Sequence, residues 1–330
     1  MIPLWRNKPV VALSFAKEKI FPLENVFPSG RQALSYTLQH AGLSRNDRVA
    51  IPEWSSHCVI SAIGKVATPI PFHEVLQHRI EVSAVLLYDQ WGWPTTSLEL
   101  IGKIIETTKC HVLIHDMVDS IPLSLNGDGN RIDELYVNQE AIKTIYSIFS
   151  LSKTLGLCGG GLAFCNYEEL RFKESGINNY DGLRQLEKSK DNNDYLLSFF
   201  KSEIPVLPCN LVEWLEENDL SQAFEVEKEK RKLNLSKVAN SRLAANWPEW
   251  MRLALNQGCM PGIVPIMKGE TEINLQEKQN EILNKYQIET SVYHFNWLNN
   301  SLEPTYEKCL AFPVHGMVTE IDEIINTLMI

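Results

Sequence analysis

The sequence lacks any hydrophobic run that approaches the roughly 20 residues needed to cross a bilayer, so we expect no membrane partner. It also lacks an excess of positive charge, because 31 Lys and Arg stand against 41 Asp and Glu, for a formal net charge of -10. General nucleic-acid binders usually carry a basic stripe, and that class is therefore disfavoured. The seven cysteines are scattered without a CxxC pair. This disfavours a zinc site and a disulfide framework, and it favours a reducing compartment, the cytoplasm.

What is present is the composition of an ordinary globular protein. Hydrophobic residues make up 44% and charged residues 22% of the 330 positions, enough for a substantial core. The length indicates one large domain and a smaller one. Residues 1–17 contain no small-residue cleavage pattern, so we interpret them as part of the mature fold rather than as a signal peptide.

The first half of the chain alternates short apolar runs with helical patterns. Helices are expected to begin near Arg31, Ser56 and Ser97. Strands are expected at residues 49–51, 67–72, 82–88, 111–114, 145–149 and 162–164. This alternation predicts an α/β domain with a mainly parallel sheet covered by helices.

The character of the sequence changes after about residue 170. Strands are expected at 263–267, 290–295 and 309–313, and a capping box at Thr319 predicts a final helix. Residues 224–237 predict a charge-rich helix whose run 227–232 is a solvated face. We place a large domain at residues 1–205 and a smaller α+β domain at residues 206–330.

Lys153 is the most informative residue. It follows the apolar run 144–149 and lies in a turn of serines and glycines at 150–161. A lysine at the end of a buried strand is poorly placed for a solvated charge. Burial lowers the pKa of such an amine, and a neutral amine can attack an aldehyde to form a Schiff base. Pyridoxal 5'-phosphate (PLP) is the commonest biological aldehyde held in this way, so we predict Lys153 to be a catalytic residue.

A PLP site also needs a carboxylate beside the pyridine nitrogen and an anion site for the phosphate. Asp116 follows a probable buried strand, at the sheet edge where ligands bind in open α/β folds, although a cap or turn aspartate is the alternative. Ser29, Gly30 and Arg31 open a helix, whose first N–H groups favour an anion, and the alternative is an ordinary serine N-cap. Ser150 can add a hydroxyl donor.

A flat side chain should cover the cofactor ring. Both His57 and Trp54 follow a predicted strand and offer such a ring, and we favour His57 on its position. The alternatives are a structural histidine and a core tryptophan.

Several segments together resemble the PLP-dependent sugar aminotransferases of the DegT/DnrJ/StrS family, which have the aspartate-aminotransferase fold (fold type I). The matching segments occur in the same order as in the family, at residues 28–34, 46–54, 90–94, 113–116, the Lys153 turn and 310–317. The resemblance implies a large domain with a mostly parallel seven-stranded sheet sandwiched by helices and a smaller C-terminal α+β domain. It also implies a homodimer with each active site at the subunit boundary.

Carried over by position, Lys153 would be the Schiff-base lysine and Asp116 the partner of the pyridine nitrogen. Ser29, Gly30 and Arg31 would then lie at the phosphate.

The chain departs from the family pattern at three positions of the expected site. The family usually has Thr or Ser where Arg31 stands, and His or Gln where Asp119 puts a second negative charge near the ring oxygen. The usual ring-stacking position aligns with Ser56 rather than His57. Other enzymes of the fold have an arginine at the position of Gly161, and we hypothesise that Arg31 supplies that missing positive charge.

The resemblance implies an aminotransferase acting on a nucleotide-linked keto sugar, as in polysaccharide biosynthesis, with glutamate or glutamine as the amino donor. Residues 206–330 offer only Arg231, Arg242 and Arg252 for a substrate carboxylate, which favours a sugar substrate. Two alternatives stay open. One is a PLP enzyme of another reaction type, such as a lyase or an acyl transferase, and the other is a degenerate, non-catalytic dimeric homologue.

Overall fold

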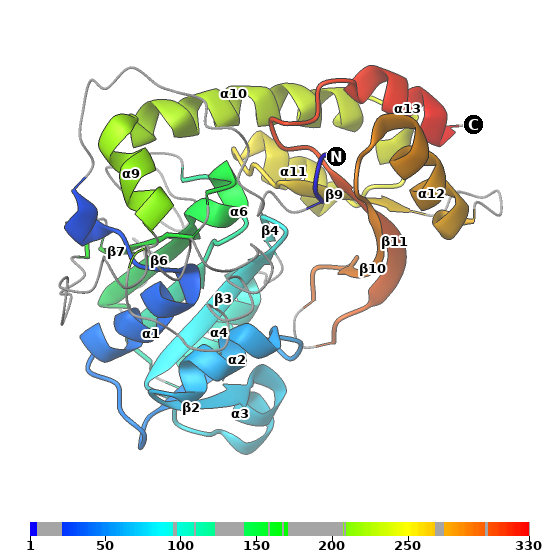
Figure 1. Cartoon of the computed structure of the whole chain (residues 1–330). Helices are drawn as coiled ribbons and strands as arrows, with labels where there is room; N and C mark the ends of the chain where they lie inside the picture. Colours follow the sequence, from blue (N-terminus) through cyan, green and yellow to red (C-terminus); the bar gives the residue numbers. More distant parts are fainter. Residues whose placement is uncertain are drawn as a thin grey trace.

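The structure is a computed structural model of the chain. It describes residues 1–4, 22–94, 98–108, 110–122, 142–157, 159–166, 168–170, 207, 209–267, 274–300 and 303–329. Within these residues a large sheet and a smaller one lie side by side, and the long helix α10 (Leu220–Ala239) runs past both of them (Figure 1).

The large sheet confirms the predicted α/β architecture. Its path runs in the order β2-β1-β3-β5-β6-β7-β8, and β4 pairs with β3 off this path. Strands β1, β2, β3, β5 and β6 are parallel to one another, whereas β4, β7 and β8 pair antiparallel with their neighbours. The bounds are β1 Arg48–Ile51, β2 Thr68–Pro71, β3 Ala84–Gln90, β4 Trp93–Pro94, β5 Val112–Asp116, β6 Thr144–Ser150, β7 Gly161–Cys165 and β8 Glu168–Glu169.

Helices cover both faces of this sheet because successive strand residues point to opposite faces. On β5, Ile114 packs under α1 (Gly30–His40) and α2 (His57–Gly64), while Leu113 packs under α3 (Phe72–His78) and α4 (Leu98–Thr108). Phe149 and Leu162 pack against α9 (Cys209–Glu217) and the first turns of α10. Between β6 and β7 lies the short helix α6 (Leu151–Leu155).

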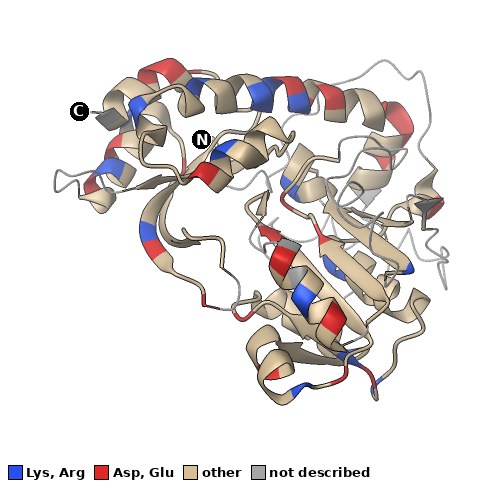
Figure 2. Cartoon of the chain, turned by 180° about the vertical axis from the view of Figure 1, so that it is seen from behind, with Lys and Arg blue, Asp and Glu red and all other residues tan. Residues whose placement is uncertain are grey.

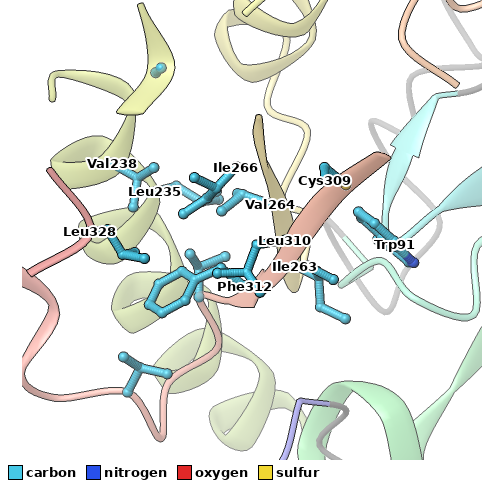
Figure 3. Packing of buried hydrophobic residues seen from close by; sticks show 14 of the residues in the cluster. Trp91, Leu235, Val238, Ile263, Val264, Ile266, Cys309, Leu310, Phe312 and Leu328 are labelled. Carbon is cyan, nitrogen blue, oxygen red and sulfur yellow. The ribbon is translucent and has the colours of Figure 1, made fainter. Parts of the chain in front are cut away.

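The small sheet is antiparallel and has the order β10-β11-β9, with bounds Ser291–Asn296, Tyr306–Pro313 and Ile263–Met267. Its core packs against the second half of α10 and against α13 (Ile321–Met329), as Leu310, Leu235 and Leu328 show in Figure 3. The helices α11 (Glu249–Asn256) and α12 (Leu275–Tyr286) complete this part.

Residues 90–94 tie the two sheets together. Trp91, which follows β3, lies in the core of the small sheet (Figure 3). The Trp93 indole N–H donates to the Ile263 carbonyl at 2.9 Å. Gly92 has a φ of +91°, and a Cβ there would lie 2.8 Å from Pro261 Cα, so this close approach requires glycine. A segment that resembled the family in sequence therefore docks the small sheet onto the large one.

Most predicted strands are confirmed to within one or two residues, and the helices predicted near Arg31, Ser56 and Ser97 are α1, α2 and α4. Ser97 itself and the proposed domain boundary at 205/206 lie outside the described residues, so that boundary stays a prediction. Among the described helices, none is long and apolar enough to cross a membrane.

The prediction that 227–232 is a solvated face was partly wrong. Both acidic and basic residues lie along α10 (Figure 2), and Glu229, Lys230 and Lys232 are exposed as expected. Glu227 and Arg231, however, are only 2% and 1% exposed. They lie one helical turn apart on the inward face of α10, where they neutralise each other.

Candidate functional site

The candidate site lies at the carboxyl edge of the parallel strands. β5 ends at Asp116 and the neighbouring β6 ends at Ser150, which leads directly into α6. The predicted turn around Lys153 is thus a five-residue helix, ended by Gly156 in the left-handed region at φ +73°. Parallel pairing brings the ends of both strands to one edge, so Asp116 and the Lys153 helix meet there.

Lys153 is paired with a carboxylate. Its Nζ lies 3.0 Å from Asp119 Oδ1, with 39% of the lysine side chain and 15% of the aspartate side chain exposed. Burial lowers the pKa of Lys153, but the charges of Asp119 and Asp116 together outweigh it, and the pKa is raised. The expectation of a desolvated, neutral amine was therefore wrong for the chain alone, because the sequence puts a second carboxylate three residues after Asp116.

Asp116 is a buried carboxylate, only 5% exposed. Burial raises its pKa to about 6, against the opposing effects of the Lys153 charge and of the Val118 N–H, which donates to Asp116 Oδ1 at 3.2 Å. Such a group is stabilised in its ionised form when a cationic donor binds beside it.

The N-terminus of α1 lies at the same edge. Ser29 caps the helix, and its Oγ accepts a hydrogen bond from the Gln32 N–H at 3.2 Å. A Cβ on Gly30 would lie 3.0 Å from Val118 Cγ1 and 3.6 Å from Ser150 Cβ, so the helix start contacts the ends of β5 and β6. The helix dipole and the N–H groups of its first turn favour an anion here. The structure thus brings Ser29, Gly30, Ser150 and Asp116 together.

Gly161 explains why the arginine of related enzymes has no counterpart here. The chain entering α1 pairs with β7, since Phe27 N–H donates to Gly161 O and Gly161 N–H donates to Phe27 O, both at 2.8 Å. A Cβ on Gly161 would lie 2.7 Å from the Ser29 carbonyl and 2.8 Å from Gly30 N. The crossing leaves no room for any side chain at this position.

The start of α2 reaches the site through a residue that the sequence analysis missed. Cys58, when ionised, adds to the charges that raise the pKa of Lys153, after Asp119 and Asp116, and Cys58 Sγ lies 2.9 Å from Ser56 Oγ. Its position one residue after His57 was the available signal. His57 itself is exposed at the first position of α2, and its ring-stacking role stays a prediction. Trp54 is 64% exposed and meets the Tyr306 ring edge-on at 6.0 Å.

A buried polar group on the other face of β5 was also missed. His115 points away from Asp116 and its Nε2 lies 2.9 Å from Asp89 Oδ1 on β3. Ser120 Oγ donates to Asp89 Oδ2 at 3.4 Å. These bonds anchor to β3 the turn that carries Asp119.

A comparison with protein families shows which family the chain belongs to. A family described as "Putative PLP-dependent aminotransferase" matches residues 17–330, nearly the whole chain. The chain belongs to this family of PLP-dependent aminotransferases. PLP is accordingly the cofactor of this aminotransferase, and its enzyme class is confirmed.

Solved structures confirm the predicted fold type of the aminotransferase. A protein from Streptococcus pneumoniae described as a "putative sugar aminotransferase", in its PLP form, is 16% identical with a TM-score of 0.52, covering 92% of this chain and 85% of that one. A serine palmitoyltransferase from S. paucimobilis is 12% identical with a TM-score of 0.52, covering 92% and 70%. At such identities the likeness shows the fold alone. A search of curated proteins finds no match.

The residues present fit PLP in this aminotransferase. The buried Asp116 carboxylate suits a cationic nitrogen, the N-terminus of the 11-residue helix α1 suits a phosphate, and the Lys153 amine suits an aldehyde. The three lie along one edge of the sheet, which is the arrangement that a single bound cofactor requires.

Proposed function

We propose that this aminotransferase transfers an amino group from glutamate or glutamine to a nucleotide-linked keto sugar. The observation that carries the proposal is the convergence of Asp116, Lys153 and the start of α1 on one sheet edge, in a chain of the aminotransferase family. When bound, PLP supplies a ring that withdraws electrons from the reacting carbon.

In this proposal Lys153 Nζ would bind the aldehyde carbon of the cofactor, and Asp116 would keep the pyridine nitrogen protonated. Ser29, Gly30 and Arg31 bind the phosphate, with the Ser150 hydroxyl as an additional donor.

Lys153 also moves the proton in the proposed reaction. As a free amine, Lys153 Nζ would carry the proton between the substrate carbon and the cofactor, which is the proton transfer that transamination requires. Asp119 Oδ1, at 3.0 Å, orients that amine and favours its protonated form. Asp119 stands where the family usually has His or Gln, and in this proposal it puts a negative charge near the ring oxygen of the cofactor. His57 would cover the ring face.

The surroundings of the arginines support a keto sugar rather than a 2-keto acid as the acceptor. A substrate carboxylate is best bound by an accessible guanidinium. Arg231 is buried against Glu227, and Arg252 donates to the Ala244 carbonyl at 2.6 Å. Two of the three arginines in residues 206–330 are therefore already engaged by the protein.

The test begins with the spectrum of the purified holoenzyme. We expect visible absorbance that is lost on borohydride reduction or in Lys153→Ala, and that glutamate or glutamine converts to the spectrum of the pyridoxamine form. Nucleotide-linked keto sugars should then restore the original spectrum, whereas simple 2-keto acids other than the co-product should not. Restoration by 2-keto acids alone would refute the sugar substrate. A spectrum that amino acids change without forming the pyridoxamine form would favour the lyase or acyl-transfer reaction.

A further inference from the structure

Helix α10 buries an ion pair that the proposed reaction does not use. Arg231 Nη2 lies 3.1 Å from Glu227 Oε1, one turn away, and the two side chains are almost fully buried. Burying both charges is costly unless further hydrogen bonds satisfy their remaining polar atoms. The bonds that Arg231 and Glu227 make therefore indicate what the pair holds in place.

The Arg231 guanidinium donates to carbonyls of three separate segments. Nη1 donates to the Asp119 carbonyl at 3.4 Å and to the Met260 carbonyl at 3.2 Å. Nη2 donates to the Thr154 carbonyl at 3.5 Å. One side chain thus joins the turn after β5, the helix that carries Lys153, and the segment that leads into β9.

Glu227 extends the same network to a fourth segment. Its Oε1 accepts hydrogen bonds from Arg231 Nε at 3.2 Å and from the Gly316 N–H at 3.1 Å, in the loop after β11. Because β9 and β11 form the small sheet, the pair connects that sheet to the edge of the large sheet.

Two glycines make room for this pair. A Cβ on Gly262 would lie 3.2 Å from Arg231 Nη1, and a Cβ on Gly316 would lie 2.6 Å from Glu227 Oε2. The backbone therefore approaches the buried charges from both sides more closely than most side chains permit. The ion pair holds segments of the protein together and does not line a binding pocket. Arg231 is only 1% exposed, and its N–H groups donate to protein carbonyls.

We propose that Arg231, oriented by Glu227, is a positioning residue that sets Lys153 and Asp119 in register with each other and with the small sheet. It acts through the backbone, since it bonds the carbonyl of Asp119 itself and that of Thr154, the residue after Lys153. The 3.0 Å contact between Lys153 Nζ and Asp119 Oδ1 is the geometry it maintains. The inference rests on the proposed roles of Lys153 and Asp119.

Two variants test this inference. Arg231→Lys keeps the charge, but an ammonium cannot span three carbonyls. The double variant Glu227→Gln/Arg231→Met removes both charges at similar volume, a replacement that buried ion pairs often tolerate. Lys232→Met is the matched control, because Lys232 is the next residue of α10 and is exposed.

We expect both Arg231 variants to unfold cooperatively and to lose tenfold or more in kcat with a smaller change in KM. The pH midpoint of the visible absorbance of the bound cofactor should shift, since Asp119 no longer faces Lys153 correctly. In the cofactor-free protein, the backbone amides of α6 should exchange with solvent several times faster. Lys232→Met should match the wild type in all three measurements.

The double variant retaining wild-type kcat, pH midpoint and amide exchange would overturn the inference. If the double variant does not fold, kcat, pH midpoint and amide exchange are compared between Arg231→Lys and the wild type, and wild-type values in Arg231→Lys would overturn the inference. The wild type and Lys153→Ala are measured alongside. Visible absorbance that does not depend on Lys153 would refute the proposed function, whereas dependence on Lys153 combined with wild-type behaviour of the Arg231 variants refutes only this inference.

Discussion

At the scale of single residues, the site sets two carboxylates, those of Asp116 and Asp119, beside one amine, that of Lys153. Asp116 is buried, and burial raises its pKa to about 6. Lys153 directs its charge to Asp119 instead, at 3.0 Å. A cationic group bound beside Asp116 would favour its ionised form and so lower this pKa.

Asp116→Asn should raise the unfolding free energy of the cofactor-free protein at neutral pH while it weakens PLP binding. The unfolded carboxyl has a pKa of 3.8 and the folded one of about 6, so the unfolded state loses its proton first as pH rises. The unfolding free energy of the cofactor-free wild type should therefore fall between about pH 4 and pH 6 and then level off. The asparagine variant should lack this fall and be more stable at pH 7 by about 1–3 kcal/mol, measured by urea unfolding.

The same substitution should weaken PLP binding, because a neutral amide does not stabilise a protonated pyridine nitrogen. Equilibrium dialysis gives the affinity. A variant that loses stability at pH 7 while it binds PLP as the wild type does would contradict both expectations.

Asp119→Asn should lower the pKa of Lys153. The Asp119 charge is the largest effect that raises this pKa, so its removal leaves burial to dominate. The visible absorbance of the holoenzyme should then titrate at lower pH than in the wild type. Glu225→Gln, which changes an exposed acid on α10, serves as the control and should leave the titration unchanged.

At the scale of elements, the crossing of β7 with the entry to α1 shapes the phosphate end of the site. Gly161 pairs with Phe27, and an isolated bridge joins Ser29 to Gly160. These contacts fix where α1 begins, and hence where its first N–H groups point. The crossing also leaves no room for a side chain at position 161 that could reach a phosphate.

Gly161→Ala tests this crossing. Its Cβ would collide with the Ser29 backbone at 2.7 Å, and such overpacking costs about 1–3 kcal/mol of unfolding free energy. The displaced Ser29 and Gly30 should also weaken PLP binding. Gly64→Ala is the control, because nothing lies within 4 Å of a Cβ there and alanine favours the helix. Equal stability of the two variants in thermal unfolding would refute the steric argument.

Arg31→Ala should weaken PLP binding severalfold if Arg31 supplies the charge that position 161 cannot. Arg31 lies in the first turn of α1, where its charge adds to the dipole of the helix. Arg45→Ala, which removes an exposed arginine bonded to the Gly64 carbonyl, should leave the affinity unchanged. Unchanged affinity in Arg31→Ala would remove this role.

At the scale of the whole molecule, contacts from several elements hold the small sheet against the large one. The Trp91 and Trp93 side chains enter the core of the small sheet, Gln90 Nε2 donates to the His294 carbonyl at 3.0 Å, and α10 passes both sheets (Figure 1). Exposed apolar side chains remain near the start of α2, where Trp54 is 64% and Ile60 is 40% exposed. We propose that a second copy of the chain covers them in a homodimer.

Light scattering after size exclusion should then give about twice the chain mass of 37.6 kDa. Ile60→Asp should shift the population towards single chains, since a buried unpaired carboxylate destabilises an apolar interface. Leu253→Asp, on an exposed position of α11, should not. A single-chain mass at every concentration would contradict the homodimer.

The sequence by itself determined the alternation of strands and helices, the residues at the ends of β5 and β6, and the family resemblance. These features depend on local periodicity and on residue order, which a linear chain displays directly. Only the tertiary structure decided that Lys153 pairs with Asp119 and that no side chain fits at Gly161. It also decided that Glu227 and Arg231 are buried within a charge run that otherwise faces solvent. Each of these features requires segments that are far apart in the chain to come into contact. Burial, steric room and the partner of a charge depend on those contacts, so the sequence alone does not display them.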